Sequence, residues 1–386
     1  MTTMAIDNKD KKILNVPPLR FPEFTEEWKA EQLDNIATLS KGIGISKEQL
    51  SEDGEPCILY GELYTKYKSE IIKQVESKTD INGSKLKRSK ANDVIIPCSG
   101  ETAVDIATAR CVPFDNILFG GDLNVISLHQ YDGAFMSYQL NGKRKYDIAR
   151  VAQGVSIVHL YGEHLKAIKT YNPTLPEQQK IAKLLSLLDD RIDTQNKIIE
   201  KLQSLIKGLR VCCMQRVYGN NVYLSEIAQI YQPQTISSTE LTEDGFLVYG
   251  ANGIIGKYKD YNHETEQICI TCRGNTCGMV NYTKPMSWIT GNAMVINTDK
   301  YQDKVCKRYL YHYLSAYNFN SIISGSGQPQ IVRTPLEKLK ITLPTISEQK
   351  QKAIIFDKIQ DKIDINHKVL NLYIGQKQYL LRQMFI

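Results

Sequence analysis

Two pairs of short turns, each containing a glycine, carry the side chains of this sequence that are best suited to binding chemistry. Ser99–Thr102 (SGET) matches Arg273–Thr276 (RGNT), and 153–160 (QGVSIVHL) matches 324–331 (SGSGQPQI). Arg can form bidentate hydrogen bonds with guanine, Asn and Gln can do so with adenine, and glycine lets a backbone approach closely. We therefore expect these turns to read the edges of DNA bases. The alternative is that they are only tight β-turns.

The candidate DNA-contacting residues add cations, which suit phosphate groups, and polar side chains from neighbouring segments. In the first copy they are Lys41, Tyr60, Glu62, Lys87, Arg88, Ser99, Glu101, Thr102, Lys143, Arg144 and Ser156. In the second copy they are Tyr249, Asn252, Arg273, Asn275, Thr276, Gln328, Gln330 and Arg333. The equivalent turns differ in side chain, as a protein that reads two different half-sites on one scaffold requires.

Catalytic machinery is not found in the sequence. No G-x-G-x-x-G motif stands between a strand and a helix, and no P-loop occurs. Cys269, Cys272 and Cys277 have a spacing that resembles a zinc site. However, Cys269 matches Ile95, a core strand position, and no fourth ligand is close in sequence. We therefore predict no catalytic residue and no bound metal.

A heptad pattern that begins near Leu175 predicts a long helix with a narrow apolar seam, which needs a partner helix. The seam residues of this first helix are Leu185, Leu188, Ile192, Gln195, Ile199 and Leu202. The same register recurs 171 positions later in Phe356, Ile359, Ile363, Asn366, Leu370 and Tyr373, and Lys377 interrupts it. A buried polar residue in a seam selects one register, so Gln195 and Asn366 could have this role. The alternative is that both are solvated breaks. Asp189 and Asp190 are expected on the solvated side of the first helix.

Repeats on either side of these helices extend the duplication to the whole chain. LDNIA at 33–37 returns as LSEIA at 224–228, with an offset of 191 positions. Repeats of this size indicate two similar structural units. We predict an α+β fold with two similar mixed α/β domains separated by two long antiparallel coiled-coil helices in a pseudo-two-fold arrangement. Its expected parts are a flexible arm at 1–17, a domain at 18–173, a spacer helix at 174–217, a domain at 218–344 and a spacer helix at 345–386.

The predicted helix length suggests what the helix pair is for. A helix of about 36 residues with a rise of ~1.5 Å per residue spans about 54 Å, which corresponds to about 16 base pairs of B-DNA. We interpret the pair as a spacer between two DNA-reading domains.

Composition restricts the class of protein. The 386 residues are 42% hydrophobic and 23% charged, as in ordinary globular proteins, and the net charge of +6 is compatible with a polyanionic partner. No apolar run is long enough for a transmembrane helix, and the N-terminal residues contain no apolar signal region. The spacings of the nine cysteines suggest no disulfide framework. We expect a cytoplasmic protein with no membrane partner.

In its motifs the chain resembles the specificity subunits of type I restriction-modification enzymes, over nearly its whole length. The motifs are PPLRFPEFTEEW at 17–28, GSGQPQI at 325–331, and the helix openings LPEQQKIA at 175–182 and ISEQKQKA at 346–353. The first copy of the loop, GVSIVHL at 154–160, keeps the glycine of the family's loop and departs after it.

The resemblance implies two target recognition domains, each of which reads one half of a split sequence in double-stranded DNA. It also implies helices that hold two methyltransferase subunits, and restriction and translocation subunits that join for cleavage. A specificity subunit of this family is not an enzyme. The resemblance therefore implies no cofactor in this chain, with S-adenosylmethionine and ATP bound only in partner subunits.

Two other classes of function remain open from the residues alone. The chain could be a coiled-coil scaffold that joins protein partners without DNA recognition. It could also be a self-contained methyltransferase or nuclease. Steeply salt-dependent DNA binding would argue against a scaffold, because neutralising phosphates releases counterions. Methyl transfer by the isolated chain would identify an enzyme.

Overall fold

The computed structural model describes residues 14–215, 217–325 and 327–386. The chain divides into two compact units. Unit 1 contains the residues up to Gln195 together with Val369–Ile386, and unit 2 contains Asn196–Lys368. Residues 1–13 of the arm expected at 1–17 lie outside the described residues.

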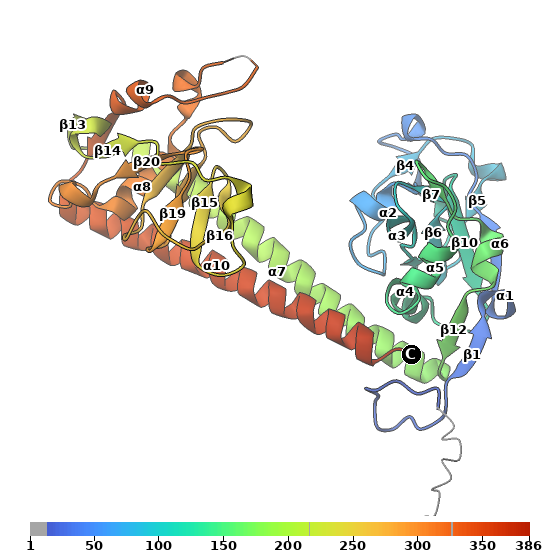
Figure 1. Cartoon of the computed structure of the whole chain (residues 1–386). Helices are drawn as coiled ribbons and strands as arrows, with labels where there is room; N and C mark the ends of the chain where they lie inside the picture. The colour runs from blue at the N-terminus through green and yellow to red at the C-terminus, as the bar shows by residue number, and fades with distance from the viewer. Residues whose placement is uncertain (1–13, 216, 326) are drawn as a thin grey trace, which may run out of the picture. The chain divides into compact units, whose positions relative to one another are not determined.

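Unit 1 is built on an antiparallel sheet with the strand order β2-β10-β6-β8. These strands are β2 (Ala37–Lys41), β10 (Leu123–Leu128), β6 (Asp93–Pro97) and β8 (Arg110–Val112). β6 is buried over its whole length, which explains its continuous apolar sequence. Helices α4 (Gly133–Asn141) and α6 (Gly162–Lys166) pack on this sheet (Figure 1). The other short helices are α1 (Leu33–Ile36), α2 (Glu62–Thr65), α3 (Ala103–Ile106) and α5 (Lys145–Val151).

Unit 1 also contains a smaller sheet and two separate strand pairs. The smaller sheet has the order β4-β3-β9-β5, in which β3 and β9 run parallel. Its strands are β4 (Lys78–Thr79), β3 (Glu55–Ile58), β9 (Leu118–Phe119) and β5 (Lys87–Arg88). The separate pairs are β1 (Lys29–Gln32) with β12 (Lys169–Asn172), and β7 (Ser99–Gly100) with β11 (Val158–His159).

Unit 2 repeats this plan with its own strands (Figure 1). Its main sheet consists of β14 (Gln229–Tyr231), β20 (Ala293–Asn297), β17 (Ile268–Thr271) and β18 (Val280–Tyr282), in this order. Its smaller sheet consists of β16 (Gly253–Tyr258), β15 (Phe246–Gly250) and β19 (Ser287–Ile289), with β15 and β19 parallel. β13 (Asn220–Tyr223) pairs with β21 (Lys340–Leu343), and the helices are α8 (Lys307–Ala316) and α9 (Arg333–Glu337).

Strand pairing follows the sequence repeat residue by residue. Lys29 lies opposite Asn172 in unit 1, and Asn220 lies opposite Leu343 in unit 2. Asn220 lies 191 positions after Lys29, and Leu343 lies 171 positions after Asn172, which are the two offsets of the sequence repeat. The predicted duplication of a mixed α/β domain is therefore confirmed.

Two long helices, α7 (Leu175–Gln215) and α10 (Ile346–Gln383), contain the predicted heptads. α7 has Pro176 in its first turn, where the missing N–H has no helical partner in any case. α10 begins with a capping box, in which the Glu348 carboxylate accepts from the Thr345 N–H at 3.0 Å and the Thr345 hydroxyl accepts from the Glu348 N–H at 3.4 Å.

Within each unit α10 packs against α7, and the pairing is antiparallel (Figure 1). In unit 1 Lys377 of α10 forms an ion pair with Asp189 of α7. In unit 2 Lys352 of α10 donates to the carbonyl oxygen of Cys213, near the other end of α7. Residues later in α7 therefore face residues earlier in α10, as the fold prediction requires.

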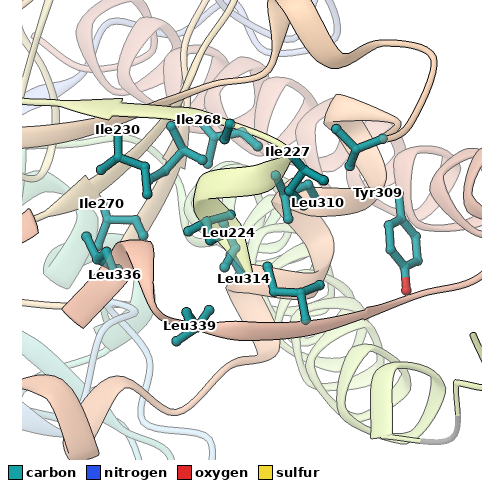
Figure 2. Close-up of a cluster of buried hydrophobic side chains, with 14 of the residues drawn as sticks. Leu224, Ile227, Ile230, Ile268, Ile270, Tyr309, Leu310, Leu314, Leu336 and Leu339 are labelled. Carbon is teal, nitrogen blue, oxygen red and sulfur yellow. The ribbon is translucent and has the colours of Figure 1, made fainter. Parts of the chain in front are cut away.

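The hydrophobic core of unit 2 joins its sheet to the long helices. Figure 2 shows side chains from η3 (Leu224–Glu226), β14, β17, α8 and α9 converging in this core. Ile206 of α7 and Phe356 of α10 belong to the same cluster. The seam of the helix pair is thus continuous with the core of the α/β domain in this unit.

Among the described residues, no helix combines the length and the apolar character that a bilayer span would need. The same residues contain no group of three or more His, Cys, Asp or Glu side chains that could hold a metal ion. Cys269 lies in the buried strand β17, and all nine cysteines are free thiols within the described part of the chain.

Candidate nucleic-acid interface

In unit 2 a short loop closes on itself through its backbone. The Ser324 N–H donates to the Gln330 carbonyl at 2.9 Å, and the Gln330 N–H donates back to Ser324 at 2.8 Å. Gly325 has a φ of +90°, and a Cβ there would lie 2.5 Å from the Gln328 carbonyl oxygen. Only glycine fits this position without strain. We call residues 324–330 the second hairpin.

The second hairpin is fastened to the turn 273–276. The Gly274 N–H donates to the Pro329 carbonyl at 2.9 Å, and the Ile331 N–H donates to the Cys272 carbonyl at 3.0 Å. Two segments that are about fifty residues apart in the sequence therefore form one surface. Its exposed side chains include those of Arg273, Asn275, Gln328 and Gln330.

Unit 1 contains the same construction, although its sequence differs. Gln153 and His159 exchange backbone hydrogen bonds at 2.9 and 2.7 Å, and Gly154 has a φ of +124°. The Leu160 N–H donates to the Cys98 carbonyl at 2.8 Å, as Ile331 does to Cys272 in unit 2. We call residues 153–159 the first hairpin. The segment GVSIVHL thus keeps the backbone of the loop, not only its glycine.

Each hairpin and its turn border a surface hollow. In unit 1 the hollow has a volume of about 680 Å³ and is lined by Tyr60, Tyr64, Glu101 and Ile157, among others. In unit 2 it has a volume of about 360 Å³, and its lining includes Gln232, Arg273, Gln330 and Arg333. The hollows are concave surfaces at the places where the sequence predicts DNA contacts.

The two surfaces carry different charges. In unit 2 the Arg273 guanidinium is exposed and forms no ion pair with the described residues, while Arg333 is paired with Glu337 at 2.6 Å. In unit 1 the carboxylate of Glu101 is exposed, and it too has no hydrogen-bond or ion-pair partner in the described chain. Thr102 caps α3 by accepting from the Asp105 N–H at 3.1 Å, so its hydroxyl is engaged locally.

Several other predicted contact residues lie on the surface near these sites. Ser156 is exposed on the first hairpin, and Ser99 lies in β7, where its carbonyl accepts from the Tyr64 hydroxyl at 3.1 Å. Lys41 ends β2 with its ammonium group 5.8 Å from the centre of the Tyr161 ring. In unit 2, Asn252 is exposed and accepts a hydrogen bond from the Thr276 hydroxyl.

Two predicted contact residues are buried, which corrects the expectation from the sequence. Glu62 lies at the start of α2, where its carboxylate accepts from the Leu59 N–H at 2.9 Å and pairs with Lys66 at 2.8 Å. Tyr249 lies in β15, and its hydroxyl accepts from the Lys284 N–H at 3.1 Å. Both side chains stabilise the fold of their own unit and are not available on its surface.

The remaining predicted cations are not brought to the hairpins. Arg88 of β5 forms a double hydrogen bond with Glu55 at 2.6 and 2.9 Å, and its neighbour Lys87 is half-buried. Lys143 is exposed between α4 and α5. Arg144 donates to the carbonyl of Ile386 at 2.8 Å, so it has a structural role in unit 1.

The predicted seam residues differ in burial along each helix. Leu185, Leu188, Gln195, Ile199, Phe356 and Ile363 are buried, and Ile192, Leu202, Ile359, Asn366, Leu370 and Tyr373 are half-buried. Gln195 is therefore not a solvated break. The Asn366 amide donates to the Lys362 carbonyl at 2.6 Å within its own helix.

Asp189 is not on a solvated face, contrary to the expectation for the pair Asp189 and Asp190. Its carboxylate is buried, pairs with Lys377 at 2.6 Å and accepts from the Tyr138 hydroxyl at 2.7 Å. Asp190 is exposed and pairs with Lys73 at 2.7 Å. Heptad position alone misplaces Asp189 because α4 of the α/β domain covers that face of α7.

The repeated glutamines Gln178 and Gln349 fix each α/β domain to its helix. The Gln178 side chain accepts from the Asp132 N–H at the start of α4 and donates to the Pro173 carbonyl, at 2.9 and 2.8 Å. Gln349 accepts from the Cys306 N–H at the start of α8 and donates to the Pro344 carbonyl, at 2.8 and 2.9 Å. The same hydrogen bonds thus connect helix and domain in both units.

A family model described as "Type I restriction modification DNA specificity domain" matches residues 25–204 and 220–372. The chain belongs to this family. Each matched segment contains one α/β domain and a large part of the long helix that follows it. We therefore call the α/β domain of unit 1 recognition domain 1 and that of unit 2 recognition domain 2.

Relatives and solved structures agree with this assignment. The type I restriction enzyme EcoprrI specificity subunit of Escherichia coli is 31% identical over 147 residues, which are 37% of this chain and 36% of that protein. The MjaVIII specificity subunit of Methanocaldococcus jannaschii is 24% identical over an alignment of 422 positions that covers 93% of this chain and 92% of the relative. The first of these matches thus spans about a third of the relative's length.

Two solved structures share the fold over nearly the whole chain. The S subunit of the type I restriction-modification system of M. genitalium has a TM-score of 0.67 at 19% identity and covers 96% of this chain and 99% of its own. A chain from a type I R-M system studied for complex assembly and conformational transition has a TM-score of 0.56 at 15% identity. It covers 95% of this chain and 99% of its own.

Sequence reasoning did not select several side chains that lie in the hairpins of this specificity protein or beside them. Tyr64, Val155 and Ile157 belong to recognition domain 1, and Gln232 belongs to recognition domain 2. The sequence did single out 153–160 as a turn, but only polar and charged side chains were chosen there as candidates, so the apolar Val155 and Ile157 were left out. Their position beside Ser156 in this turn was the available signal.

Proposed function

We propose that the chain is the DNA-specificity subunit of a type I restriction-modification complex. In this proposal recognition domains 1 and 2 each bind one half of a split site in double-stranded DNA, and the chain itself catalyses no reaction. The observation that carries the proposal is the duplicated hairpin and turn. The two copies have the same backbone hydrogen bonds and different side chains, as reading two unlike sequences on one scaffold requires.

The long helices are the proposed attachment site for two methyltransferase subunits. In unit 1 the side chains of Leu372 and Tyr379, seven residues apart on α10, are 72% and 58% exposed. Their spacing places them on one face of the helix, away from the seam. Exposed apolar side chains at such spacing suit a protein partner. The methyltransferase subunits would bind the methyl donor S-adenosylmethionine. The restriction and translocation subunits would bind ATP.

The test is to identify methylated bases in cells that express this chain together with its methyltransferase subunit. We expect a split motif with a fixed gap. Replacing residues 222–343 by the second recognition domain of another specificity subunit should change one half of the motif and leave the other half intact. The proposal fails if no split motif appears, or if both halves survive the replacement.

A coiled-coil scaffold without DNA recognition is the competing function, because exposed apolar residues on α10 would serve it equally well. A gel-shift titration of the complex at increasing salt separates the two. Phosphate contacts make DNA affinity fall steeply with salt concentration, whereas a scaffold would show no specific shift at any salt concentration.

A further inference from the structure

The two hairpin sites present opposite hydrogen-bonding chemistry. In recognition domain 2, Arg273 offers only donors, and Gln328 and Gln330 offer amide groups. In recognition domain 1, Ser99 replaces Arg273, Ile157 replaces Gln328, and Glu101 replaces Asn275. An ionised carboxylate only accepts hydrogen bonds. The hairpin and turn of recognition domain 1 therefore lack the guanidinium that suits guanine in recognition domain 2.

The tip of the first hairpin is apolar and uncovered. Val155 is 98% exposed and Ile157 is 60% exposed. The backbone hydrogen bonds between Gln153 and His159 close the loop and hold the backbone of its tip in this shape. Two β-branched residues held outward on a closed loop suit a small apolar group on a binding partner.

Glu101 and Ile157 line the same hollow. Its neighbour Asp105 is engaged by the Thr102 hydroxyl at 2.6 Å, whereas Glu101 has no partner among the described side chains. A carboxylate is repelled by phosphate groups, so a favourable contact of Glu101 with DNA has to be with the bases. There it can accept a hydrogen bond from an exocyclic amino group, that of adenine or cytosine.

A single base pair can satisfy both features only if it is an A·T pair. In the major groove an A·T pair presents the adenine N6 amino donor together with the thymine methyl group, whereas a G·C pair presents an amino donor but no methyl group. We propose that the first hairpin and the turn 99–102 read an A·T pair in the major groove. Glu101 accepts from the adenine amino group, and Val155 and Ile157 pack on the thymine methyl group. This inference rests on the proposed function.

The methylation experiment described above first defines the split motif, and exchange of residues 222–343 shows which half belongs to recognition domain 1. The purified complex of this chain with its methyltransferase subunits is then titrated with duplexes carrying that motif. In each duplex one thymine of the domain 1 half is replaced by deoxyuridine, which lacks only the methyl group. We expect one replacement to weaken binding roughly fivefold, and the same replacements in the domain 2 half to serve as controls.

Two variants of recognition domain 1 test the named side chains. Val155→Ser combined with Ile157→Ser should remove the sensitivity to deoxyuridine. Glu101→Ala, which removes the acceptor, should reduce discrimination at the same base pair by roughly tenfold and leave the other half of the motif unchanged. Glu52→Ala, at an exposed glutamate elsewhere in the same domain, is the matched control.

The outcomes separate this inference from the proposed function. If no split motif exists, the proposed function itself fails. If the motif exists but its domain 1 half contains no A·T pair, the inference is overturned while the specificity function stands. The same holds if no deoxyuridine replacement in the domain 1 half weakens binding, because the thymine methyl group then makes no contact that matters. The deoxyuridine titration uses the unmodified chain, so a variant that fails to fold does not affect its result.

Discussion

The ammonium nitrogen of Lys377 lies 2.6 Å from a carboxylate oxygen of Asp189 and 2.5 Å from one of Glu70. All three side chains are largely buried in unit 1. Burial raises the pKa of Asp189, and the charge of Lys377 opposes this rise. The lysine that interrupts the heptad seam and the aspartate expected in solvent are thus partners in one polar cluster that joins both long helices to the recognition domain.

Lys377→Met should destabilise the protein strongly, because it leaves two buried carboxylates without their cation. Removing one partner of a buried ion pair costs about 3–5 kcal/mol. The free energy of unfolding, measured by denaturant titration, checks this value. Adding Asp189→Asn to the variant should restore part of the loss, and Lys183→Met on the exposed side of α7 is the control. Equal stability of Lys377→Met and the control would contradict a structural role.

The imidazole of His312 should make stability depend on pH. Its Nδ1 accepts from the Arg210 Nε–H at 3.1 Å, and its Nε2 lies 2.8 Å from the Asp357 carboxylate. Burial lowers the pKa of His312 below its ordinary value of 6.5, and the charges of Arg210 and Arg308 add to this, outweighing the hydrogen bond with Asp357. The folded protein therefore favours the neutral form of the imidazole more strongly than the unfolded chain does.

Because the folded pKa is depressed, the unfolded chain takes up a proton on this histidine more readily than the folded chain. The stability of unit 2 is then complete above about pH 6.5 and falls as the pH drops from there toward the folded pKa of His312. In His312→Gln, the decrease of Tm between about pH 7.5 and about pH 5.5 should be smaller than in the unmodified protein. His367→Gln, at an exposed position on α10, should keep the original slope.

Gln349→Ala should destabilise the contact of recognition domain 2 with α10. It would leave the Cys306 N–H and the Pro344 carbonyl without their hydrogen-bond partner. Unpaired buried polar groups cost about 1–3 kcal/mol. Gln178→Ala should have a similar effect in unit 1, because Gln178 forms the equivalent bonds. Denaturant unfolding measures both, and Gln351→Ala, exposed on the same helix, should change little. If only one of the two variants lost stability, Gln178 and Gln349 would not have equivalent roles.

Arg273→Ala should relax sequence preference in the half-site of recognition domain 2 only. A lost bidentate contact to guanine is worth about 1–3 kcal/mol of discrimination. Methylation mapping of the complex should show additional bases at one position of that half, with the other half unchanged. Lys300→Ala, an exposed lysine of the same domain, is the comparison. Uniform weakening on all DNA sequences by Arg273→Ala would show that this residue contacts a phosphate instead.

The sequence predicted most of the architecture, because it is duplicated and each copy constrains the other. The register of β1 on β12 recurs in β13 on β21, at the offsets that the sequence contains. The contact residues were harder to predict, because local sequence does not show which side chains the fold turns inward. In the sequence Glu62 looks like a surface carboxylate. In the structure it is buried, and its carboxylate accepts a hydrogen bond from the Leu59 N–H at the start of α2. Likewise, a heptad cannot reveal that α4 covers Asp189.

The closure of the two hairpins by backbone hydrogen bonds and one glycine has an evolutionary consequence. Because no side chain at the tip of the first hairpin is needed to hold its shape, Val155, Ser156 and Ile157 can change without loss of the fold. If the first hairpin reads DNA as we propose, such a loop can acquire a new target sequence by point substitution alone. A library randomised at these three codons would then be a direct route to specificity subunits with new DNA targets.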